Sequence, residues 1–216
     1  LWIGSDMGLY KGEPATGGNM DFSLALPLSA PQVGAVTAIL PDDEGTDLWL
    51  GMYRVGLARF DPAAGQVVRT YEPDPTDANS LADNLIMGLF PGRDGSLWIA
   101  NIEGLDHFDP RTETFRHYRG DASDPHGLSK ARLHWVYEDE SGAVWGSTNG
   151  DGLQRLDPTT GTCAHYREAD GLPNDVVYAI LPEQRAGTTY LWLSTNNGLS
   201  RFDPQAGTFR NYSYLD

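Results

Sequence analysis

Tryptophan returns at an almost fixed interval along this chain, and this period constrains the fold more than any other feature. Five times an apolar residue precedes a tryptophan, and the intervals between these tryptophans are 47 or 49 residues. A Gly-Leu pair follows each of them, with its leucine seven or eight residues after the tryptophan. A constant period of this length predicts that one supersecondary unit is repeated, so we expect an array of repeats in place of independent cores. The tryptophans are Trp2, Trp49, Trp98, Trp145 and Trp192.

The first half of each repeat has the pattern of two buried strands joined by a tight turn. An apolar run of five or six residues comes first, rich in β-branched and aromatic side chains, and a second apolar segment around the tryptophan follows. A polar turn that ends in glycine separates the two, which is typical of a β-hairpin. The first runs are 36–40, 85–90, 133–137 and 176–181, the tryptophan segments include 48–50, 97–99 and 191–193, and the turns are 43–45, 93–95, 140–142 and 185–187.

The second half of each repeat predicts two further strands. One begins at the Gly-Leu pair and ends in Asp-Pro, where the carboxylate caps backbone amides and proline presets the turn. The last strand ends in tyrosine. Each complete repeat is therefore predicted to be a four-stranded antiparallel meander, the blade of a β-propeller. The Asp-Pro pairs begin at Asp61, Asp109, Asp157 and Asp203, and the last strands cover 67–71, 115–118, 163–166 and 209–212.

The predicted fold class is all-β, with about five propeller blades. A partial blade covers 1–32, and complete blades cover about 33–72, 82–119, 131–167 and 174–213. The first unit departs from the pattern, because it lacks an inner strand and replaces Phe-Asp-Pro by a glycine-rich excursion at 13–19. Helical repeats are excluded, since glycine or proline interrupts every candidate amphipathic window. We expect an open arc, completed by missing sequence or by another copy, since closed propellers leave no exposed edges.

Composition excludes several kinds of partner. The net charge is −15, and the only lysines are Lys11 and Lys130. Nucleic acids and anionic lipid surfaces need clustered basic side chains, so we expect neither nucleic-acid binding nor membrane contact by this segment. No run of about 18 apolar residues predicts a membrane-spanning helix. The single cysteine, Cys163, stands where other repeats place Phe115 or Phe209, and we expect it to be a packed apolar residue.

The repeated strings resemble a known family. Residues 94–100, Asp-Gly-Ser-Leu-Trp-Ile-Ala, with the later Gly104-Leu105 and Phe108-Asp109-Pro110, resemble the two-component regulator propeller repeat. The preceding segment 79–86 resembles it too, with weaker copies at 170–177 and 126–129. The resemblance covers almost all of 33–212. It implies a fragment of a seven-bladed propeller from the periplasmic sensor portion of a bacterial signalling protein, joined to a histidine kinase or diguanylate cyclase output domain.

Candidate ligand-binding residues are those by which the repeats differ. In propellers, the loops between the second and third strands and those before the inner strand meet on one face. Their carboxamides, carboxylates and cations suit a polar or polyhydroxylated ligand, although Asn and Asp also tolerate left-handed turn conformations. Trp135, the one tryptophan outside the repeat register, is either a stacking surface or core filling. The candidates are Tyr53, Arg54, Asn101, Glu103, Asn149, Asp151, Asn196, Asn197, His126, Arg132 and Trp135.

The repeated residues are expected to be scaffold. The tryptophans at 49, 98, 145 and 192 would pack between adjacent blades, and the Asp-Pro aspartates would cap turns. The five histidines have no metal-ligand spacing, and no segment presents the oxygen ligands of a calcium loop, so we expect no metal and no cofactor. No nucleophile motif or phosphate loop is present, and we expect no catalytic residues in this segment.

The sequence therefore favours a non-catalytic ligand-sensing or interaction module with a small-molecule or oligosaccharide ligand. Two alternatives stay open. One is a propeller lyase or glycosidase acting on a polar or glycan-like substrate, for which the required arginine cluster is not evident. The other is a protein–protein scaffold, which fits the fold but lacks the Gly-His and Trp-Asp signature of WD repeats.

Overall fold

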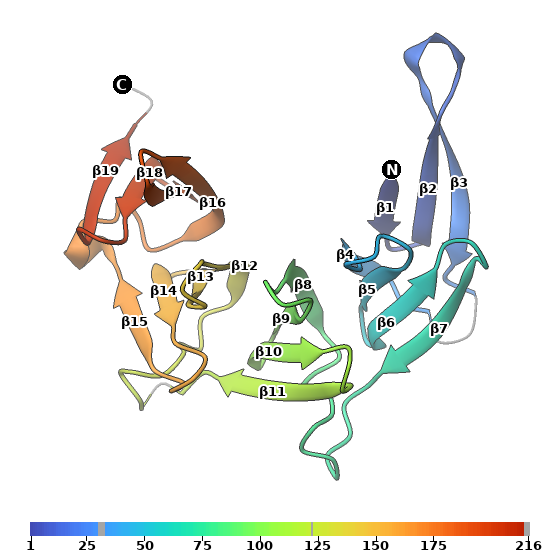
Figure 1. Ribbon diagram of the computed structural model, residues 1–216, viewed down its shortest axis with the longest axis horizontal. Coiled ribbons are helices and arrows are strands. Elements are labelled where there is room, and N and C mark those ends of the chain that lie inside the picture. Colours follow the sequence, from blue (N-terminus) through green and yellow to red (C-terminus); the bar gives the residue numbers. More distant parts are fainter. Residues whose placement is uncertain (30–32, 122, 214–216) are drawn as a thin grey trace. The chain divides into compact units, whose positions relative to one another are not determined.

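The computed structural model describes residues 1–29, 33–121 and 123–213, and the strands β1 to β19 form five antiparallel sheets (Figure 1). The chain divides into two compact units, Leu1–His117 and Tyr118–Asp216. Each sheet is a meander, because every strand pairs with its neighbour in sequence. The all-β class and the antiparallel meanders are as predicted. In the described residues, no helix has the length and apolar character that crossing a membrane requires.

The first unit holds three sheets. The first is three-stranded, and residues 30–32 at the end of the unit predicted for 1–32 lie outside the described residues. The boundary between the two units falls within β11. The sheets are β1 (Trp2–Ser5), β2 (Gly8–Pro14) and β3 (Met20–Pro27); β4 (Val36–Pro41), β5 (Leu48–Met52), β6 (Gly56–Asp61) and β7 (Gln66–Tyr71); and β8 (Ile86–Pro91), β9 (Leu97–Asn101), β10 (Gly104–Asp109) and β11 (Thr114–Arg119).

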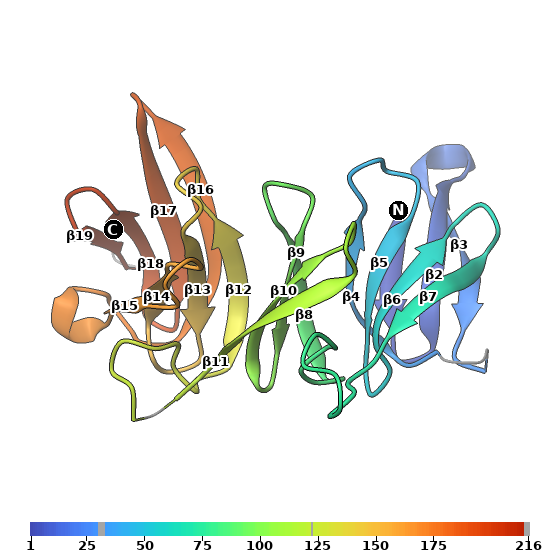
Figure 2. The same ribbon diagram turned by 60° about the horizontal axis from the view of Figure 1, so that its bottom comes forward.

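The second unit holds two four-stranded sheets. The hairpin of β16 and β17 is longer than those of the other four-stranded sheets, and in Figure 2 it projects beyond the β12–β13 hairpin of the same unit. Its turn at Ala186 and Gly187 has positive φ at both residues, which closes a two-residue hairpin. The sheets are β12 (Leu133–Glu138), β13 (Val144–Thr148), β14 (Leu153–Leu156) and β15 (Cys163–Tyr166); and β16 (Val177–Arg185), β17 (Thr188–Thr195), β18 (Gly198–Asp203) and β19 (Thr208–Tyr212).

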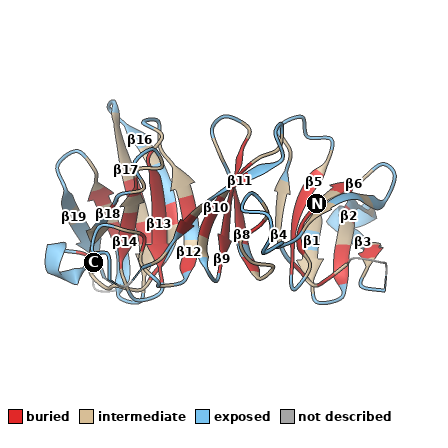
Figure 3. Ribbon diagram, turned by 90° about the horizontal axis from the view of Figure 1, so that it is seen from below, coloured by how far each residue is buried: buried red, intermediate tan, exposed pale blue. Residues whose placement is uncertain are grey.

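The second strand of each sheet supplies much of the core. Every residue of β5, β9 and β13 is buried, as the red segments of Figure 3 show. β5 and β9 contain tryptophan segments that are apolar without alternation, and a strand covered on both faces needs apolar side chains at successive positions. The prediction of a strand buried on both faces is confirmed for these two. It is wrong for the inner strands β4, β8, β12 and β16, each of which contains exposed residues, and in β17 Trp192 is only partly buried.

The tryptophans join neighbouring sheets within each unit. Trp49 packs in one cluster with Leu81, Ile86 and Phe108 of the following sheet and its lead-in loop. Trp145 packs in the same way with Leu172, Val177 and other residues of the next sheet. Both indole rings meet a phenylalanine edge-on, Trp49 with Phe108 at 5.5 Å and Trp145 with Phe202 at 5.7 Å between centroids. The scaffold interpretation of Trp49 and Trp145 is therefore confirmed.

The Asp-Pro turns are capped as expected. One carboxylate oxygen of each aspartate accepts the backbone N–H two residues later, at 2.7 to 2.9 Å. The amide of Arg111, and after it the Arg111 side chain, hold the pKa of Asp109 below its usual range. Glycine at positive φ closes three of these turns, at Gly65, Gly161 and Gly207, and Glu113 takes that conformation in the fourth.

A β-bulge recurs near the start of each inner strand. The register shifts at Thr37, Met87, His134 and Tyr178, the second residue of β4, β8, β12 and β16. Within the units, the bulged side chain bonds to the next sheet: Thr37 Oγ1 donates to the carbonyl of Ile86 at 2.8 Å, and His134 Nδ1 lies 2.9 Å from the carbonyl of Val177. The bulge thus turns a side chain outward to link one sheet to the next.

Candidate functional site

The two sets of loops that the sequence singled out meet at one end of the sheet β12–β15. The loop 149–152 joins β13 to β14, and the segment 120–132 leads into β12. The N–H of Asn149 donates to the carbonyl of Arg132 at 2.9 Å, which ties the two segments together. The meander forces this meeting, because the start of the first strand and the end of the second lie at the same end of an antiparallel sheet.

A cavity of about 410 Å³ opens beside these loops, and we call it the loop pocket. Its wall is formed by the lead-in segment, by the β13–β14 loop and by the end of β15. Three acidic and three basic side chains line this cavity. These side chains are Asp121, Asp124, Lys130, Asp151, His165 and Arg167.

Asp151 organises the pocket. Its Oδ1 accepts a hydrogen bond from Arg167 Nε at 2.7 Å, and its Oδ2 lies 3.5 Å from His165 Nδ1 and 3.4 Å from Gln154 Nε2. Burial raises the pKa of Asp151, but the hydrogen bonds and charge of Arg167, together with Ser129, outweigh it and the pKa is lowered. The carboxylate therefore stays ionised at neutral pH and serves as a fixed acceptor.

His165 has one nitrogen without a hydrogen bond. Its side chain is 10% exposed, and its Nε2 lies 3.1 Å from the carbonyl of Gly127, which can only accept. This contact places a proton on Nε2. In the part of the chain that the structure describes, the buried Nδ1 atom makes no hydrogen bond, and the carboxylate of Asp151 lies 3.5 Å from it. A buried polar atom without a hydrogen bond is a place where water or a ligand can bind.

The cations of the pocket have capacity for a ligand. Arg167 uses Nε for Asp151, and no hydrogen bond among the described residues uses its two amino nitrogens. Lys130 is exposed and makes no hydrogen bond or ion pair among those residues. The hydrogen bonds from Ser123, and to a smaller degree the charge of Lys130, hold the pKa of Asp121 low. The pocket thus offers positive charge and ionised carboxylates side by side.

Comparison with the neighbouring sheets shows which contacts of the loop pocket recur in other repeats and which are found in this sheet. In the sheet β8–β11, His117 Nε2 lies 3.1 Å from the carbonyl of Ala78, and in β16–β19 the amide of Asn211 donates to the carbonyl of Gly171 at 3.0 Å. The contact of His165 with Gly127 repeats this anchor of the lead-in loop. The acid differs: Asp106 of β10 is buried against His117 at 2.7 Å, whereas the corresponding strand position holds Gln154 and the acid, Asp151, lies on the loop.

Other predicted residues of the second unit lie near the same end of the sheets. His126 and Arg132 are exposed, and their described hydrogen bonds involve backbone atoms. Trp135 is 43% exposed on β12. Asn196 accepts a hydrogen bond from Tyr178 Oη at 2.6 Å, and Asn197 donates to the carbonyl of Pro173 at 3.2 Å.

An aromatic pair accompanies Asn196. The rings of His134 and Tyr178 are stacked with centroids 5.3 Å apart, and Tyr178 is 48% exposed. Sequence reasoning missed Tyr178, His165 and Arg167. No signal marked them, because each lies within or directly after a strand that also exists in every complete repeat.

The predicted residues of the first unit are arranged differently. Arg54 has φ 63°, and its guanidinium carbon lies 5.2 Å from the ring centroid of Tyr53, which is 45% exposed. Non-glycine residues seldom adopt this conformation, and those that do are concentrated at active sites, ligand clamps and switch regions. Asn101 is 3% exposed: its amide donates to Asp106 and its oxygen accepts from the backbone of the exposed Glu103, so the fold already occupies it.

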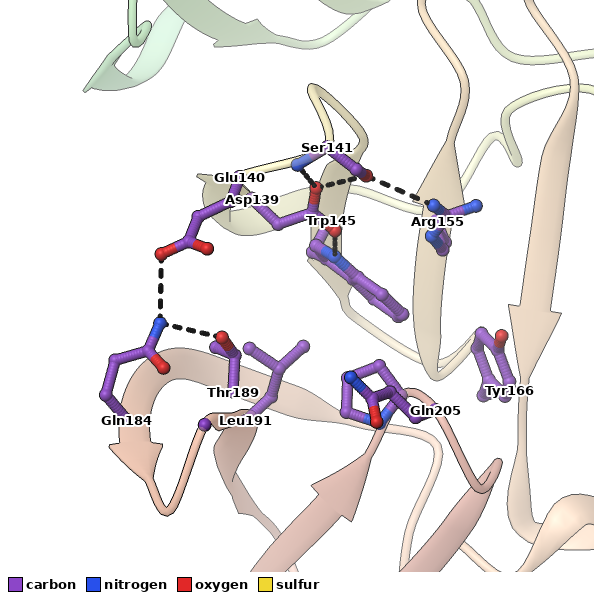
Figure 4. A pocket seen from close by; sticks show the side chains of 12 residues that line it. Asp139, Glu140, Ser141, Trp145, Arg155, Tyr166, Gln184, Thr189, Leu191 and Gln205 are labelled. Atoms are coloured by element: carbon purple, nitrogen blue, oxygen red, sulfur yellow. Dashed lines mark hydrogen bonds between the residues drawn. The ribbon is translucent and has the colours of Figure 1, made fainter.

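A second cavity, of about 400 Å³, lies at the opposite ends of the strands, between the β12–β13 turn and the β16–β17 hairpin (Figure 4). Asp139 Oδ2 accepts the indole N–H of Trp145 at 2.7 Å there, and Gln184 donates to Glu140 at 3.1 Å. A counterpart of about 370 Å³ exists in the first unit around Trp49. Arginine covers the indole in both, Arg155 at 5.6 Å and Arg59 at 5.7 Å. Because a tryptophan covered by an arginine lines the cavity in both units, we attribute the cavity to the packing of sheets.

Solved structures with this fold include extracellular domains of bacterial signalling proteins. That of BT3049 from B. thetaiotaomicron, described as a hybrid two-component system, is 22% identical, covers 98% of this chain and has a TM-score of 0.77. That of BT4673 from the same organism, described as a one-component system in one structure and a hybrid two-component system in another, is 17% and 19% identical, covers 98% and 97%, and has TM-scores of 0.70 and 0.69.

At these identities the likeness shows the fold. The two-component regulator propeller repeat, which the motifs of this chain resemble, also belongs to bacterial signalling proteins. The chain spans 28%, 35% and 29% of the lengths of these three structures. It matches no protein-family model and no curated protein sequence.

Proposed function

We propose that this chain is an extracytoplasmic ligand-sensing module of a bacterial transmembrane signalling protein, and that it holds a small polar ligand in the loop pocket. The observation that carries the proposal is the buried Nδ1 of His165, which makes no hydrogen bond among the described residues and faces the loop pocket beside ionised Asp151. The fold shared with extracellular domains of two-component systems supports the sensing role.

The charges of the pocket define the ligand class. Lys130 and the amino nitrogens of Arg167 suit an anionic group, and the free oxygens of the carboxylates suit hydroxyl or ammonium donors. A ligand with a carboxylate and several hydroxyl groups, such as a sugar acid, offers both and can also form a hydrogen bond with His165 Nδ1. Hydrogen-bonding groups that are fixed on a scaffold before binding give such a site its specificity.

The pKa values of the pocket favour binding over catalysis. A carboxyl that acts as a general acid near neutral pH needs a raised pKa, as in glycoside hydrolysis. The pKa values of Asp121 and Asp151 are both lowered, so both are acceptors and neither is suited to donate a proton. We therefore propose a non-catalytic role for this segment.

Isothermal titration with galacturonate, glucose, glucosamine and glutamate tests the pocket. We expect galacturonate to bind more tightly than glucose, and Lys130→Gln with Arg167→Gln to weaken its binding at least tenfold while the circular dichroism spectrum shows that the variant is folded. Arg185→Gln, at the exposed β16–β17 turn, is the control, because it removes a cation that lies outside the loop pocket. Equal binding by the pocket variant and the control would show that the ligand lies elsewhere. In the signalling protein that carries the module, the same ligand should change the output, and the pocket variant should not respond.

A further inference from the structure

The cavity at the β12–β13 turn, which we call the turn cavity, differs from its counterpart in the first unit by the carboxylates it contains. In both cavities an arginine on the third strand of the sheet covers the tryptophan indole, Arg59 on β6 and Arg155 on β14. The two arginines hold the same register position, since Arg59 pairs with Trp49 and Arg155 with Trp145. The two cavities can therefore be compared residue by residue.

In the first unit, carboxylates of the chain itself occupy the donors of this arrangement. Arg59 donates from Nε to Asp47 at 2.6 Å, and its Nη2 lies 3.4 Å from Asp42. Tyr71, the last residue of β7, donates from its hydroxyl to Glu113 of the next sheet at 2.7 Å. The arginine and the tyrosine beside the indole of this unit are thus both paired with acids.

The second unit keeps the donors and lacks these acids. Ala143 directly precedes β13 and donates its backbone N–H to the aspartate of its turn, as Asp47 does before β5, so Ala143 stands in the place of Asp47. Gly207 closes its Asp-Pro turn at positive φ, which is the position of Glu113 in the first unit. Neither alanine nor glycine has a side chain that can accept a hydrogen bond.

Arg155 and Tyr166 consequently have unused donors that line the turn cavity (Figure 4). Tyr166 is the counterpart of Tyr71, because each pairs with the Gly-Leu leucine of its sheet. Among the described residues, Arg155 makes one long hydrogen bond, from Nη2 to Ser141 Oγ at 3.5 Å, and no ion pair. The hydroxyl of Tyr166 makes no hydrogen bond within that part of the chain.

The two acids that line the turn cavity have other partners. Asp139 Oδ1 accepts hydrogen bonds within its own turn, and its Oδ2 accepts the indole N–H of Trp145 at 2.7 Å. Glu140 accepts a hydrogen bond from Gln184 of the β16–β17 hairpin at 3.1 Å. The charge of Arg155 is therefore not matched by a contact with either acid.

The rest of the wall suits an organic anion. Gln205 follows Pro204 where the first unit has Arg111 after Pro110, and its side-chain amide makes no hydrogen bond among the described residues. Leu191 and Pro204 add apolar surface. The volume of about 400 Å³ is in the range of small-molecule sites, which combine apolar walls with a few polar groups.

We propose that the turn cavity binds a small organic carboxylate, which supplies to Arg155 and Tyr166 the acceptors that Asp47 and Glu113 supply in the first unit. A guanidinium that stacks on an aromatic face keeps its N–H groups available in its own plane, where they match the geometry of a carboxylate. Such charge-assisted hydrogen bonds are about twice as strong as neutral ones. The site is independent of the loop pocket, which lies at the other end of the strands.

Titration of the isotope-labelled chain with succinate, followed by NMR, tests this site. Succinate offers one carboxylate to each donor, and we expect it to shift the Arg155 Nε–H and Trp145 indole N–H resonances until they saturate. Succinamide, its neutral analogue, should bind more weakly, as should inorganic phosphate, which has no carbon chain to lie against Leu191 and Pro204. Succinamide or phosphate binding as tightly as succinate, or no saturable shift at millimolar succinate, overturns the proposal.

Two variants remove the donors. Arg155→Gln should weaken succinate binding by about tenfold or more, and Tyr166→Phe by about threefold or more. Arg59→Gln is the matched control, because Asp47 already occupies that arginine, and it should bind succinate like the unsubstituted chain. The double variant of Lys130 and Arg167 should also bind succinate normally, so failure of the loop pocket and failure of this site are distinguishable. Circular dichroism establishes that each variant is folded.

Ala143→Asp restores the acid that the first unit has. The new carboxylate should pair with Arg155, as Asp47 pairs with Arg59, and should abolish succinate binding without lowering the unfolding midpoint. This variant keeps both donors, so its effect does not depend on the loss of either side chain. Succinate shifts that persist in folded Ala143→Asp and Arg155→Gln would show that the ligand lies elsewhere, which overturns the proposal.

Discussion

Glu113 accepts a hydrogen bond from the hydroxyl of Tyr71 at 2.7 Å while its own backbone lies in the left-handed region, at φ 55°. The corresponding turns hold glycine, at Gly65, Gly161 and Gly207. The hydrogen bond from the Tyr71 hydroxyl holds the pKa of Glu113 below its usual range; burial opposes it, and the charge of Arg69 adds to the lowering. One repeat thus replaces the residue best suited to its turn by a residue that bonds to the preceding sheet.

Two substitutions of Glu113 should separate the cost of its left-handed backbone conformation from the contribution of its hydrogen bonds to Tyr71 and Arg69. Glu113→Ala loses the bonds to Tyr71 and Arg69 and keeps a strained backbone, so we expect a loss of about 1 kcal/mol in unfolding free energy. Glu113→Gly loses the same bonds but relieves the strain, and should be more stable than the alanine variant by roughly 1 kcal/mol. Urea denaturation of both variants measures the difference, and equal stabilities would contradict the strained conformation.

Stability should depend on pH through Asp139. Burial raises its pKa, but the bonds from Ser141, Trp145 and Ala143 outweigh burial, so the folded-state pKa is lowered. The contribution of Asp139 is therefore fully present above the unfolded-state pKa of about 3.9 and is lost as the pH falls through the lower folded-state value.

The substitution Asp139→Asn tests this dependence. We expect it to cost about 1 kcal/mol at neutral pH, because the side chain is only partly buried, and the difference from the unsubstituted chain should shrink below about pH 4. Thermal unfolding at several pH values provides the comparison. Asp6→Asn, at an exposed position with no hydrogen bond among the described residues, controls for the substitution. A difference that stays constant from neutral to acid pH would contradict the assignment.

Two leucines at the same place in the repeat should differ in their contribution to stability. Leu153 is fully buried and Leu199 is 49% exposed. Leu153→Ala should lose about 2–5 kcal/mol, because it leaves a cavity between two sheets. Leu199→Ala should lose about 0.5 kcal/mol or less, because its side chain is half exposed. Chemical denaturation decides, and similar losses would mean that Leu199 is covered in the monomer.

The thiol of Cys163 should be inert in the folded chain. It is 5% exposed, and burial raises its pKa to about 12. Since the thiolate is the reactive species, a disulfide reagent at pH 8 should label it only after unfolding. The denatured chain should then release one equivalent, because this is its single cysteine. Rapid labelling of the folded chain would place the thiol at the surface.

The repeat made the fold predictable, and the same repeat concealed parts of the candidate site. Strand types, the Asp-Pro caps and the packing of Trp49 and Trp145 follow from residues that recur at one spacing, so each copy supports the interpretation of the others. Asp151 stood out because its loop has an extra residue. His165 and Arg167 did not, since they occupy the end of an ordinary last strand, and only the folded chain brings them to the loop.

Asn101 shows the opposite limit. Its residue type and its place beside a loop are those of a ligand-binding residue. Its amide, however, donates a hydrogen bond at 3.1 Å to Asp106, on the neighbouring strand β10 of the same hairpin. Whether a loop asparagine faces solvent or caps its own turn depends on the residue that the opposite strand presents. That information is three-dimensional, and the spacing of the repeat does not contain it.

The bulge at the start of each inner strand has a consequence for how such arrays change. At the two junctions where a bulged side chain bonds to the next sheet, the acceptor is a main-chain carbonyl, of Ile86 or of Val177, while the donor is threonine in one case and histidine in the other. A main-chain acceptor is present whatever the side chain of that residue. A duplicated or transplanted repeat therefore finds an acceptor for this bond at its new neighbour, and any side-chain donor at the bulge can form it. Recombination between repeats can accordingly alter the loops while each joint continues to form.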